Sequence, residues 1–133
     1  MIITKECDYA LRIIRQLSDY EIQSVAVICK NESIPQKFAY KILNKLEKAC
    51  LVKGVRGRTG GYKLVAELGG ITLFDVIQSV GGNIMFNCCI NEGVVCPNNS
   101  SEKRCLVHRE FLRIQKSLEQ ELGGKSIKEI LDK

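Results

Sequence analysis

Residues 34–64, IPQKFAYKILNKLEKACLVKGVRGRTGGYKL, hold the pattern from which the fold of this chain follows. Up to about Ala49 the pattern is helical, because side chains about 100° apart divide into a polar face and an apolar face. Pro35 suits the first turn of this helix, where its missing N–H has no partner to lose. The polar face comprises Lys37, Tyr40, Lys41, Asn44 and Lys48, and the apolar face comprises Phe38, Ala39, Ile42, Leu43, Leu46 and Cys50.

Two short strand-like runs follow the helix, at 51–56 and 62–65, on either side of the glycine-rich turn GRTGG. This arrangement predicts a β-hairpin. A phosphate-binding nucleotide loop would need a helix after the glycines and a Gly-Lys-Ser/Thr ending, and the sequence has neither. A shorter helix, capped by Ser24 and ending near Lys30, precedes the longer one across a polar turn at 31–33. The two helices, the turn and the hairpin together predict a winged helix-turn-helix.

Basic residues gather in the same part of the chain. Residues 30–63 contain nine Lys or Arg against two Glu, a local charge of +7; the whole chain has a formal net charge of +5, so the remaining residues sum to −2. This concentration is the expected footprint of a polyanion-binding face, and a solvated surface is the plainer alternative. We predict that the face binds DNA through Gln36, Lys37, Tyr40, Lys41, Asn44, Lys48, Arg56, Arg58, Thr59 and Tyr62.

Helical patterns before and after this region predict a mostly α fold with a small β-hairpin wing. Residues 3–19 have apolar side chains at helical spacing, with Thr4 in position to cap the helix. Thr72 caps a further helix, which runs to about Val80 and ends at a pair of glycines. These elements complete a winged helix-turn-helix domain, which we place at residues 1–80.

The rest of the chain predicts a loop, a long helix and a last short helix. Residues 103–122 carry an apolar stripe at a spacing of three or four, but little of their own chain remains to cover it. A second copy of the chain is the economical partner, which predicts a homodimer. A capping box at Ser126 begins the last helix. We therefore assign 81–102 to a cysteine-bearing sensor loop and 103–133 to a dimerisation helix with a C-terminal helix.

The segment from Cys88 to His108, CCINEGVVCPNNSSEKRCLVH, holds four of the seven cysteines and the only histidine. Much of it is rich in Asn and Ser, and cysteines in such a loop have no core to fill. In a reducing compartment these cysteines favour metal or redox chemistry over disulfides. Three Cys and one further ligand suit an iron–sulfur cluster, and three Cys with one His also form a zinc ligand set. Cys7, Cys29 and Cys50 lie within apolar patterns, which indicates packing.

The composition restricts the other classes of protein. The chain has 133 residues, of which 45% are hydrophobic and 26% charged, which suits one soluble domain with an appended helix. No apolar run approaches membrane-spanning length and no signal peptide opens the chain, so we expect a cytoplasmic protein without a membrane partner. No candidate nucleophile has a partnered base, so we predict that the chain is not an enzyme.

Together these features resemble the IscR- and NsrR-type regulators, which are winged-helix transcription factors of the Rrf2 family. The segments that carry the resemblance are ALRI (10–13), IPQKFAYKILNKLEKACLV (34–52), VRGRTGGYKL (55–64) and ITLFDVI (71–77), followed by the spaced cysteines and the long helix. They cover almost the whole chain. The RGxxGGY wing followed by spaced cysteines is fairly specific to that family.

The resemblance implies a homodimer that binds a pseudo-palindromic operator in double-stranded DNA, with the recognition helix in the major groove and the wing at the minor groove. It also implies an iron–sulfur cluster, in a two-iron or a four-iron form, held by Cys89, Cys96 and Cys105. The fourth ligand would be His108, as in IscR-like members, or Asp8 of the partner subunit, as in NsrR-like members.

The function implied is that of a transcriptional repressor whose operator affinity is controlled by the cluster, with redox state, nitric oxide or the supply of iron and clusters as the signal. The alternative is a cluster-free winged-helix repressor controlled by thiol oxidation, zinc or a partner enzyme. Cys88 fits either reading, since it is a substitute ligand beside Cys89 and also a candidate for a redox disulfide.

Overall fold

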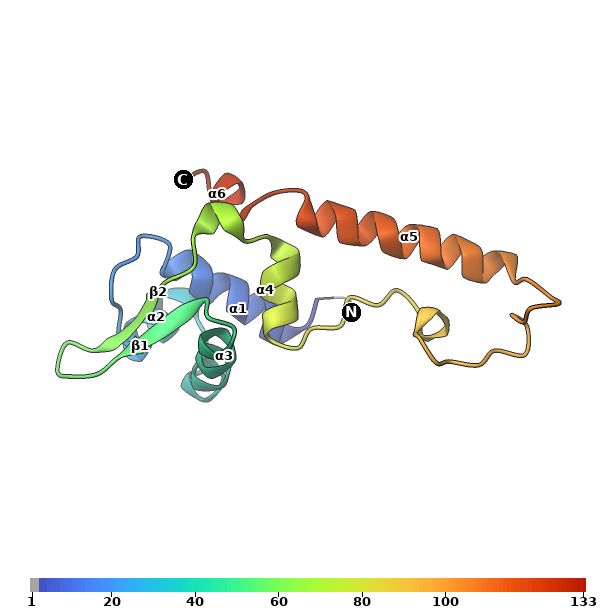
Figure 1. The fold of residues 1–133 in the computed structure, drawn as a ribbon. Helices are drawn as coiled ribbons and strands as arrows, with labels where there is room; N and C mark the ends of the chain where they lie inside the picture. The colour runs from blue at the N-terminus through green and yellow to red at the C-terminus, as the bar shows by residue number, and fades with distance from the viewer. Residues whose placement is uncertain (1–2) are drawn as a thin grey trace.

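The structure is a computed structural model that describes residues 3–133. Residues 1–2 of the predicted first domain lie outside the described part. Figure 1 shows a winged-helix body at one end of an elongated molecule and one long helix extending from it. The elements are α1 (Lys5–Gln16), α2 (Val25–Glu32), α3 (Gln36–Lys48), β1 (Val52–Val55), β2 (Gly61–Leu64), η1 (Leu68–Gly70), α4 (Leu73–Ser79), η2 (Cys88–Ile90), α5 (Leu106–Gly123) and α6 (Ile127–Ile130). The predicted mostly α class with a hairpin wing is confirmed.

The core lies where α1, α2, α3 and α4 pack together, and the hairpin joins it through its inward side chains. The predicted caps Thr4, Ser24 and Thr72 each accept a hydrogen bond from a backbone N–H in the first turn of their helices. Burial of Cys7 confirms its prediction as a packing residue. The largest fully buried side chains belong to Cys7, Ile13, Ile14, Leu17, Ile28, Ile42, Leu43, Leu46, Val52, Val76 and Ile77.

Two residues that the periodicity assigns to the buried face of α3 are exposed. Phe38 is 43% exposed and lies against Tyr9, with 6.0 Å between the ring centroids. Cys50 follows the C-cap residue of α3 and has a left-handed backbone, with φ of 60°. The helical period no longer applies beyond the cap, so the side chain of Cys50 points to solvent instead of packing.

The helix α2 is longer than its sequence pattern predicts, and its last residue is a buried glutamate that pairs with an exposed arginine. Glu32, expected in a polar turn, is only 7% exposed. Its carboxylate accepts hydrogen bonds from Nε (3.1 Å) and Nη2 of Arg15, and its backbone carbonyl accepts one from Arg12 (3.2 Å). Ser33 then ends the helix in a left-handed conformation. These contacts attach the first helix of the helix-turn-helix to α1.

The hairpin is tied to the start of α2 as well as to itself. Its two strands pair antiparallel, with Gly54 opposite Tyr62. The backbones of Gln23 and Tyr62 exchange two hydrogen bonds of 2.9 Å. A Cβ atom added to Gly61 would lie 2.1 Å from the carbonyl oxygen of Gln23. Only a glycine therefore allows the wing to approach α2 this closely.

We expect Gly61→Ala to lower the free energy of unfolding by about 1–3 kcal/mol, because the added methyl group forces apart two bonded backbones. Gly70→Ala is the matched control, since a Cβ there meets nothing within 4 Å. Urea unfolding followed by circular dichroism measures both. Equal midpoints for the two variants would show that the wing does not pack against the segment before α2.

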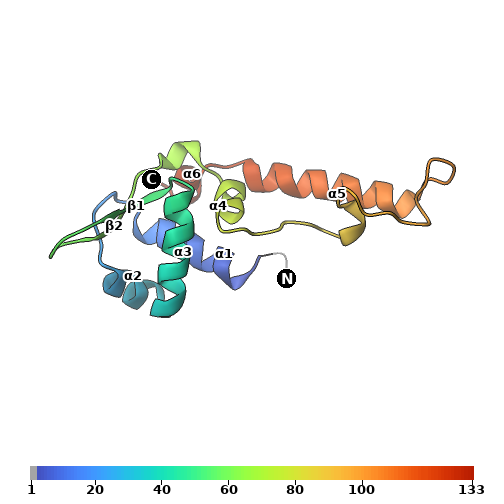
Figure 2. The same ribbon diagram turned by 60° about the horizontal axis from the view of Figure 1, so that its bottom comes forward.

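The last helix returns to the body after the excursion of α5, as Figures 1 and 2 show. The predicted capping box is present, with the Ser126 and Glu129 side chains each bonded to the other's backbone. The Ile127 N–H donates to the carbonyl of Ile71 (2.8 Å), and the Ile127 side chain is 3% exposed. Although it follows α5 in sequence, α6 thus shares the core of the winged helix.

Candidate nucleic-acid interface and cysteine loop

The polar face of α3 is open to solvent. Figure 2 shows α3 along its length, with α2 and the hairpin to one side of it. All the side chains predicted on this helix to bind DNA are exposed; they belong to Gln36, Lys37, Tyr40, Lys41, Asn44 and Lys48. This position leaves the face free to enter a groove of a duplex.

The predicted wing contacts lie in the hairpin turn and on its second strand. Arg56, Arg58 and Thr59 are exposed in the segment between β1 and β2. Tyr62 is half-buried on β2, and this burial raises the pKa of its hydroxyl, with the nearby side chains of Glu47 and Tyr40 adding to the effect. Tyr62 therefore helps to hold the wing beside α3, and the arginines are the groups free to reach a phosphate.

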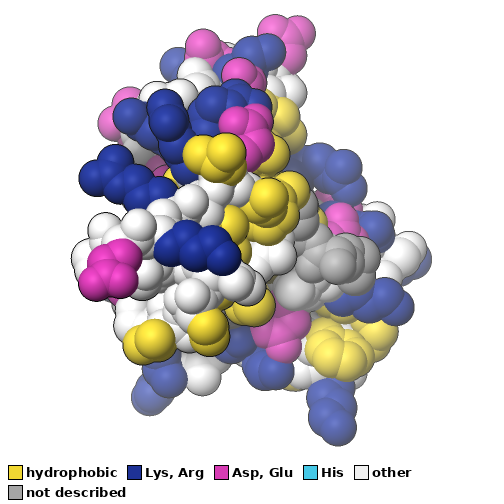
Figure 3. All heavy atoms as spheres, turned by 90° about the vertical axis from the view of Figure 1, so that its right-hand side faces the viewer, with side chains coloured by type: hydrophobic (Ala, Val, Ile, Leu, Met, Phe, Trp, Pro, Cys, Tyr) yellow, Lys and Arg dark blue, Asp and Glu magenta, His cyan; other side chains and the backbone are white. Residues whose placement is uncertain are grey.

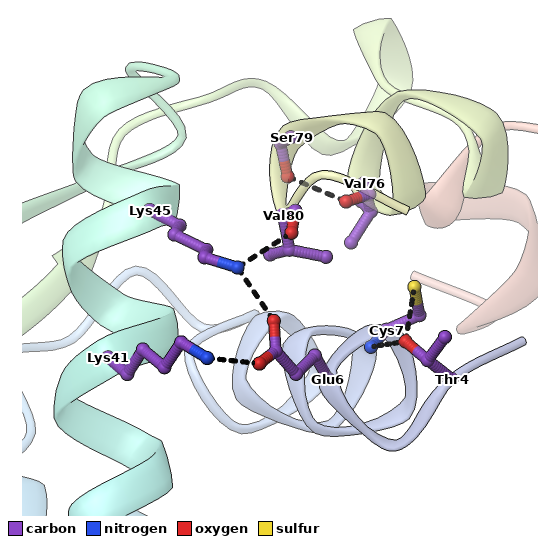
Figure 4. A network of polar contacts seen from close by, with 8 residues as sticks. All are labelled: Thr4, Glu6, Cys7, Lys41, Lys45, Val76, Ser79 and Val80. Carbon is purple, nitrogen blue, oxygen red and sulfur yellow. Dashed lines mark hydrogen bonds and ion pairs between the residues drawn. The ribbon is translucent and has the colours of Figure 1, made fainter. Parts of the chain in front are cut away.

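Two lysines of α3 are already paired within the chain (Figure 4). Nζ of Lys41 lies 2.5 Å from one carboxylate oxygen of Glu6, and Nζ of Lys45 lies 2.6 Å from the other. Lys45 also donates to the carbonyl of Val80, the C-cap residue of α4 (3.0 Å). Hydrogen bonds from Lys41 and then Lys45 lower the pKa of Glu6. Sequence reasoning did not single out Glu6 or Lys45, because their partners lie more than 30 residues away.

The cysteine loop leaves the winged-helix body after α4 and runs alongside α5 to the far end of that helix (Figure 1). Of the loop cysteines, Cys89, Cys96 and Cys105 are half-buried and Cys88 is exposed. Asn99 joins two parts of the loop, because its N–H donates to the carbonyl of Cys96 (3.0 Å) and its side-chain oxygen accepts from the N–H of Cys105 (3.2 Å). The sequence gives no direct sign of this role of Asn99.

The loop thiols lie near one another, around Cys89. Partial burial raises the pKa of Cys89, and neighbouring thiols raise it further; they belong to Cys88, Cys96 and Cys105. Within residues 3–133, however, no three His, Cys, Asp or Glu side chains converge closely enough to hold a metal ion. The predicted ligands therefore share one loop without forming a closed site, and their role stays a prediction.

The two candidates for a fourth ligand differ in their surroundings. Nδ1 of His108 is buried and has no hydrogen-bond partner in the described part of the chain. The N–H of His108 donates to Sγ of Cys105 (3.4 Å), which caps α5. Asp8 lies on α1 in the winged-helix body, where its carboxylate is 2.9 Å from the guanidinium of Arg12.

The root of the loop is fastened to α5. The side chain of Gln115 donates to the carbonyl of Ile84 (2.7 Å) and accepts from the N–H of Phe86 (2.8 Å). The rings of Phe86 and Phe111 meet edge to face, with 5.2 Å between centroids. Gln115 of α5 therefore fixes the path of the chain where the loop leaves the winged-helix domain.

A winged helix with an exposed basic recognition face, followed by a cysteine loop and a long helix, defines the class of DNA-binding transcriptional regulators. The chain belongs to the Rrf2 family, whose description is iron-dependent transcriptional regulator and whose sequence model matches residues 3–133. The resemblance seen in the sequence is thereby confirmed. Members of this family regulate transcription and bind DNA, so the prediction that the chain is not an enzyme is confirmed as well.

Individual relatives agree with this placement. The HTH-type transcriptional regulator NsrR of Oceanobacillus iheyensis is 30% identical over 96 residues, which cover 70% of this chain and 65% of the relative. Two solved structures share the fold. CymR, the global cysteine regulator of B. subtilis, has a TM-score of 0.78 at 21% identity, covering 99% of this chain and 97% of that one. IscR of T. potens has a TM-score of 0.76 at 21% identity, covering 99% and 87%.

The membrane question has a direct structural answer for the described residues. Among them, no helix combines the length and the apolar character that crossing a bilayer requires.

Proposed function

We propose that this chain is a repressor whose affinity for a DNA operator is controlled by an iron–sulfur cluster in the cysteine loop. The observation that carries the proposal is the buried Nδ1 of His108, which has no hydrogen-bond partner among residues 3–133 and belongs to the residue three positions after the half-buried Cys105. Leaving a buried polar atom unpaired costs about 1–3 kcal/mol, so this nitrogen gains from a partner, and a metal centre held by the loop cysteines would supply one. Oxidation or a shortage of iron would destroy such a cluster, and its loss would be the signal.

The donor chemistry of the loop suits such a cluster. Cys89, Cys96 and Cys105 would be the thiolate ligands, because they are half-buried in one loop and the thiols of Cys96 and Cys105 are near enough to Cys89 to raise its pKa. Cys88 is exposed, so we assign it the role of a substitute ligand that could replace one of these three cysteines. His108 is favoured as the fourth ligand, since it follows Cys105 by one helical turn and its imidazole nitrogen is unpaired in the described part of the chain.

Asp8 of the partner subunit is the weaker candidate for that position. In the single chain its carboxylate already has the guanidinium of Arg12 as a partner at 2.9 Å. To bind a cluster, this carboxylate would have to give up an ion pair, whereas His108 has no ion pair within residues 3–133. A zinc ion would accept the same three Cys and one His, so elemental analysis has to separate the two metals.

A homodimer formed through α5 is part of the proposal. This 18-residue helix has no fully buried side chain in the described chain. Its apolar residues near the loop are strongly exposed: Leu106 (76%), Val107 (59%) and Leu112 (45%). Figure 3, viewed from this end of the molecule, shows hydrophobic side chains lying between Lys and Arg side chains. A second α5 would cover part of this exposed apolar surface and bring two recognition faces to one operator.

The loop would affect DNA binding through the attachments at its N-terminal end, one to α3 and one to α5. It begins directly after Val80, whose carbonyl binds Lys45 of α3, and its root is held on α5 by Gln115. A cluster that binds one arrangement of the loop more tightly than another would shift the population of that arrangement. The shift in operator affinity would equal the differential affinity of the cluster for the two states.

The test is isolation of the full chain under anaerobic conditions, with analysis of iron, acid-labile sulfide and zinc. We expect brown protein with iron and sulfide in similar amounts, and a change in operator affinity when the cluster is removed by oxygen and a chelator. The operator is first selected from random duplexes with this protein. Colourless protein that contains zinc, or identical operator binding with and without the cluster, would contradict the proposal.

The wing has its own prediction. Replacing Arg56 and Arg58 together by Ala should weaken binding to every duplex and flatten its salt dependence by a slope of about 2, since each lost phosphate contact removes about 0.9. Both guanidinium groups are exposed, so their loss should leave the melting temperature nearly unchanged. Fluorescence anisotropy with labelled duplexes at several salt concentrations measures the slope. Parental binding at every salt concentration would mean that the wing does not touch DNA.

A further inference from the structure

The recognition helix presents its lysines in two different states. Lys37 and Lys48 are exposed and have no ion pair within residues 3–133, whereas Lys41 and Lys45 share the carboxylate of Glu6. Figure 4 shows both amines turned from α3 toward the first turn of α1. The Glu6 side chain is 28% exposed, so this carboxylate faces the helix more than the solvent.

We propose that Glu6 is a positioning residue that withholds Lys41 from DNA and thereby limits binding that does not depend on sequence. Phosphate contacts supply affinity for any duplex, whereas base contacts supply specificity. A carboxylate that pairs with one lysine of the recognition helix lowers the affinity from phosphate contacts and leaves the base contacts unchanged. The inference rests on the DNA-binding function of the family and does not depend on any cofactor in the loop.

The two lysines are not equivalent in this arrangement. Lys45 has a second partner in the carbonyl of Val80 and a side chain that is 34% exposed, so it also joins α3 to α4. Lys41 is bound to Glu6 alone among the described residues and is 55% exposed. Its amine is therefore the one that a phosphate could draw away, and Glu6 is the group that competes for it.

Stability alone is a weak reason for this pairing. Ion pairs near the surface contribute little to folding, because the gain in water is small and two long side chains lose freedom. Competition for a phosphate is a different matter. If Lys41 moves from Glu6 to DNA, the carboxylate keeps Lys45 but loses one of its two cationic partners, so it attracts a counterion while the DNA releases one and the net release of ions is smaller.

Removing the charge of Glu6 should therefore steepen the salt dependence of DNA binding. For Glu6→Gln we expect a slope steeper by about 0.9, which is about a threefold greater loss of affinity between about 50 and about 200 mM salt. The probe is a labelled random-sequence duplex, measured by anisotropy with cluster-free full-length protein in chelator and reductant. Glu67→Gln is the matched control, since it makes the same change of charge at the exposed residue before η1.

A second set of variants does not depend on how well Glu6→Gln folds. Lys41→Gln should weaken binding to the random duplex less than the same change at Lys37 does, because Glu6 competes with the phosphates for Lys41. Lys37→Gln, on the same helix, should weaken binding and flatten its salt dependence by about 0.9, so that about threefold less affinity is lost over the same salt range. When Lys41→Gln is introduced into the Glu6→Gln protein, it should lower the affinity for the random duplex about as much as Lys37→Gln does in the parent.

The outcomes separate clearly. The inference is supported if Glu6→Gln steepens the salt dependence and Glu67→Gln does not. It also requires that Lys41→Gln weakens binding less than Lys37→Gln does in the parent protein. It is overturned if Glu6→Gln binds like Glu67→Gln or more weakly than the parent, or if Lys41→Gln costs as much as Lys37→Gln in the parent background. Because the protein is cluster-free throughout, failure here leaves the proposal for the loop untouched, and failure of that proposal leaves this result untouched.

Discussion

Cys105→Ser is expected to abolish the binding of iron and sulfide by protein isolated under anaerobic conditions. In the structure Sγ of Cys105 accepts from the N–H of His108 as the cap of α5, and the backbone N–H of Cys105 binds Asn99. Serine is among the best N-cap residues, so the substitution keeps the helix start and the loop contact. What it removes is one thiolate, and a hydroxyl is a poor replacement for it at iron.

Iron and acid-labile sulfide per chain, together with the visible absorbance, measure the effect. Cys50→Ser is the matched control, because it makes the same chemical change at an exposed cysteine outside the loop. We expect the control to retain the parental amounts and both variants to have parental far-ultraviolet circular dichroism. Retention of iron and sulfide by the Cys105 variant would remove this residue from the ligand set.

Much of the fold could be predicted because its signals are local. Each cap that the sequence indicates has its hydrogen bond, and the apolar spacing of α3 places Ile42, Leu43 and Leu46 in the core. The exceptions lie where the chain meets distant parts of itself. Glu32 is buried because Arg15 of α1 reaches its carboxylate, and no local pattern around a polar turn contains that information.

The candidate site was less accessible to sequence reasoning. The spacing of the cysteines indicates a metal centre, but the ligand set came from a family resemblance and is still a prediction. Asn99 and Gln115, which shape the loop, belong to types that are common in any loop or helix. Glu6 was hidden for a similar reason, since a helical wheel shows the free face of α3 but not a carboxylate arriving from α1.

Ile42→Ala is expected to lower the free energy of unfolding by about 2–5 kcal/mol. Ile42 is fully buried in α3, between α1 and the rest of the core, so truncation removes apolar contact and leaves a cavity. Small domains have about 5–15 kcal/mol in total, so the loss is a large share of the stability. Urea unfolding at one fixed protein concentration measures it, which keeps any effect of association constant between variants.

Ile22→Ala is the matched control, because the same side chain is shortened where it is 44% exposed, in the segment before α2. We expect a loss within about 0.5 kcal/mol there. The comparison also bears on function. Ile42 and Leu43 are buried on one face of α3, and Lys41 lies on the exposed face. The packing of the apolar face therefore determines which face of the helix is available for DNA. Equal losses in the two variants would mean that α3 does not pack through this face, and the assignment of its lysines and Asn44 to a DNA interface would then have lost its structural basis.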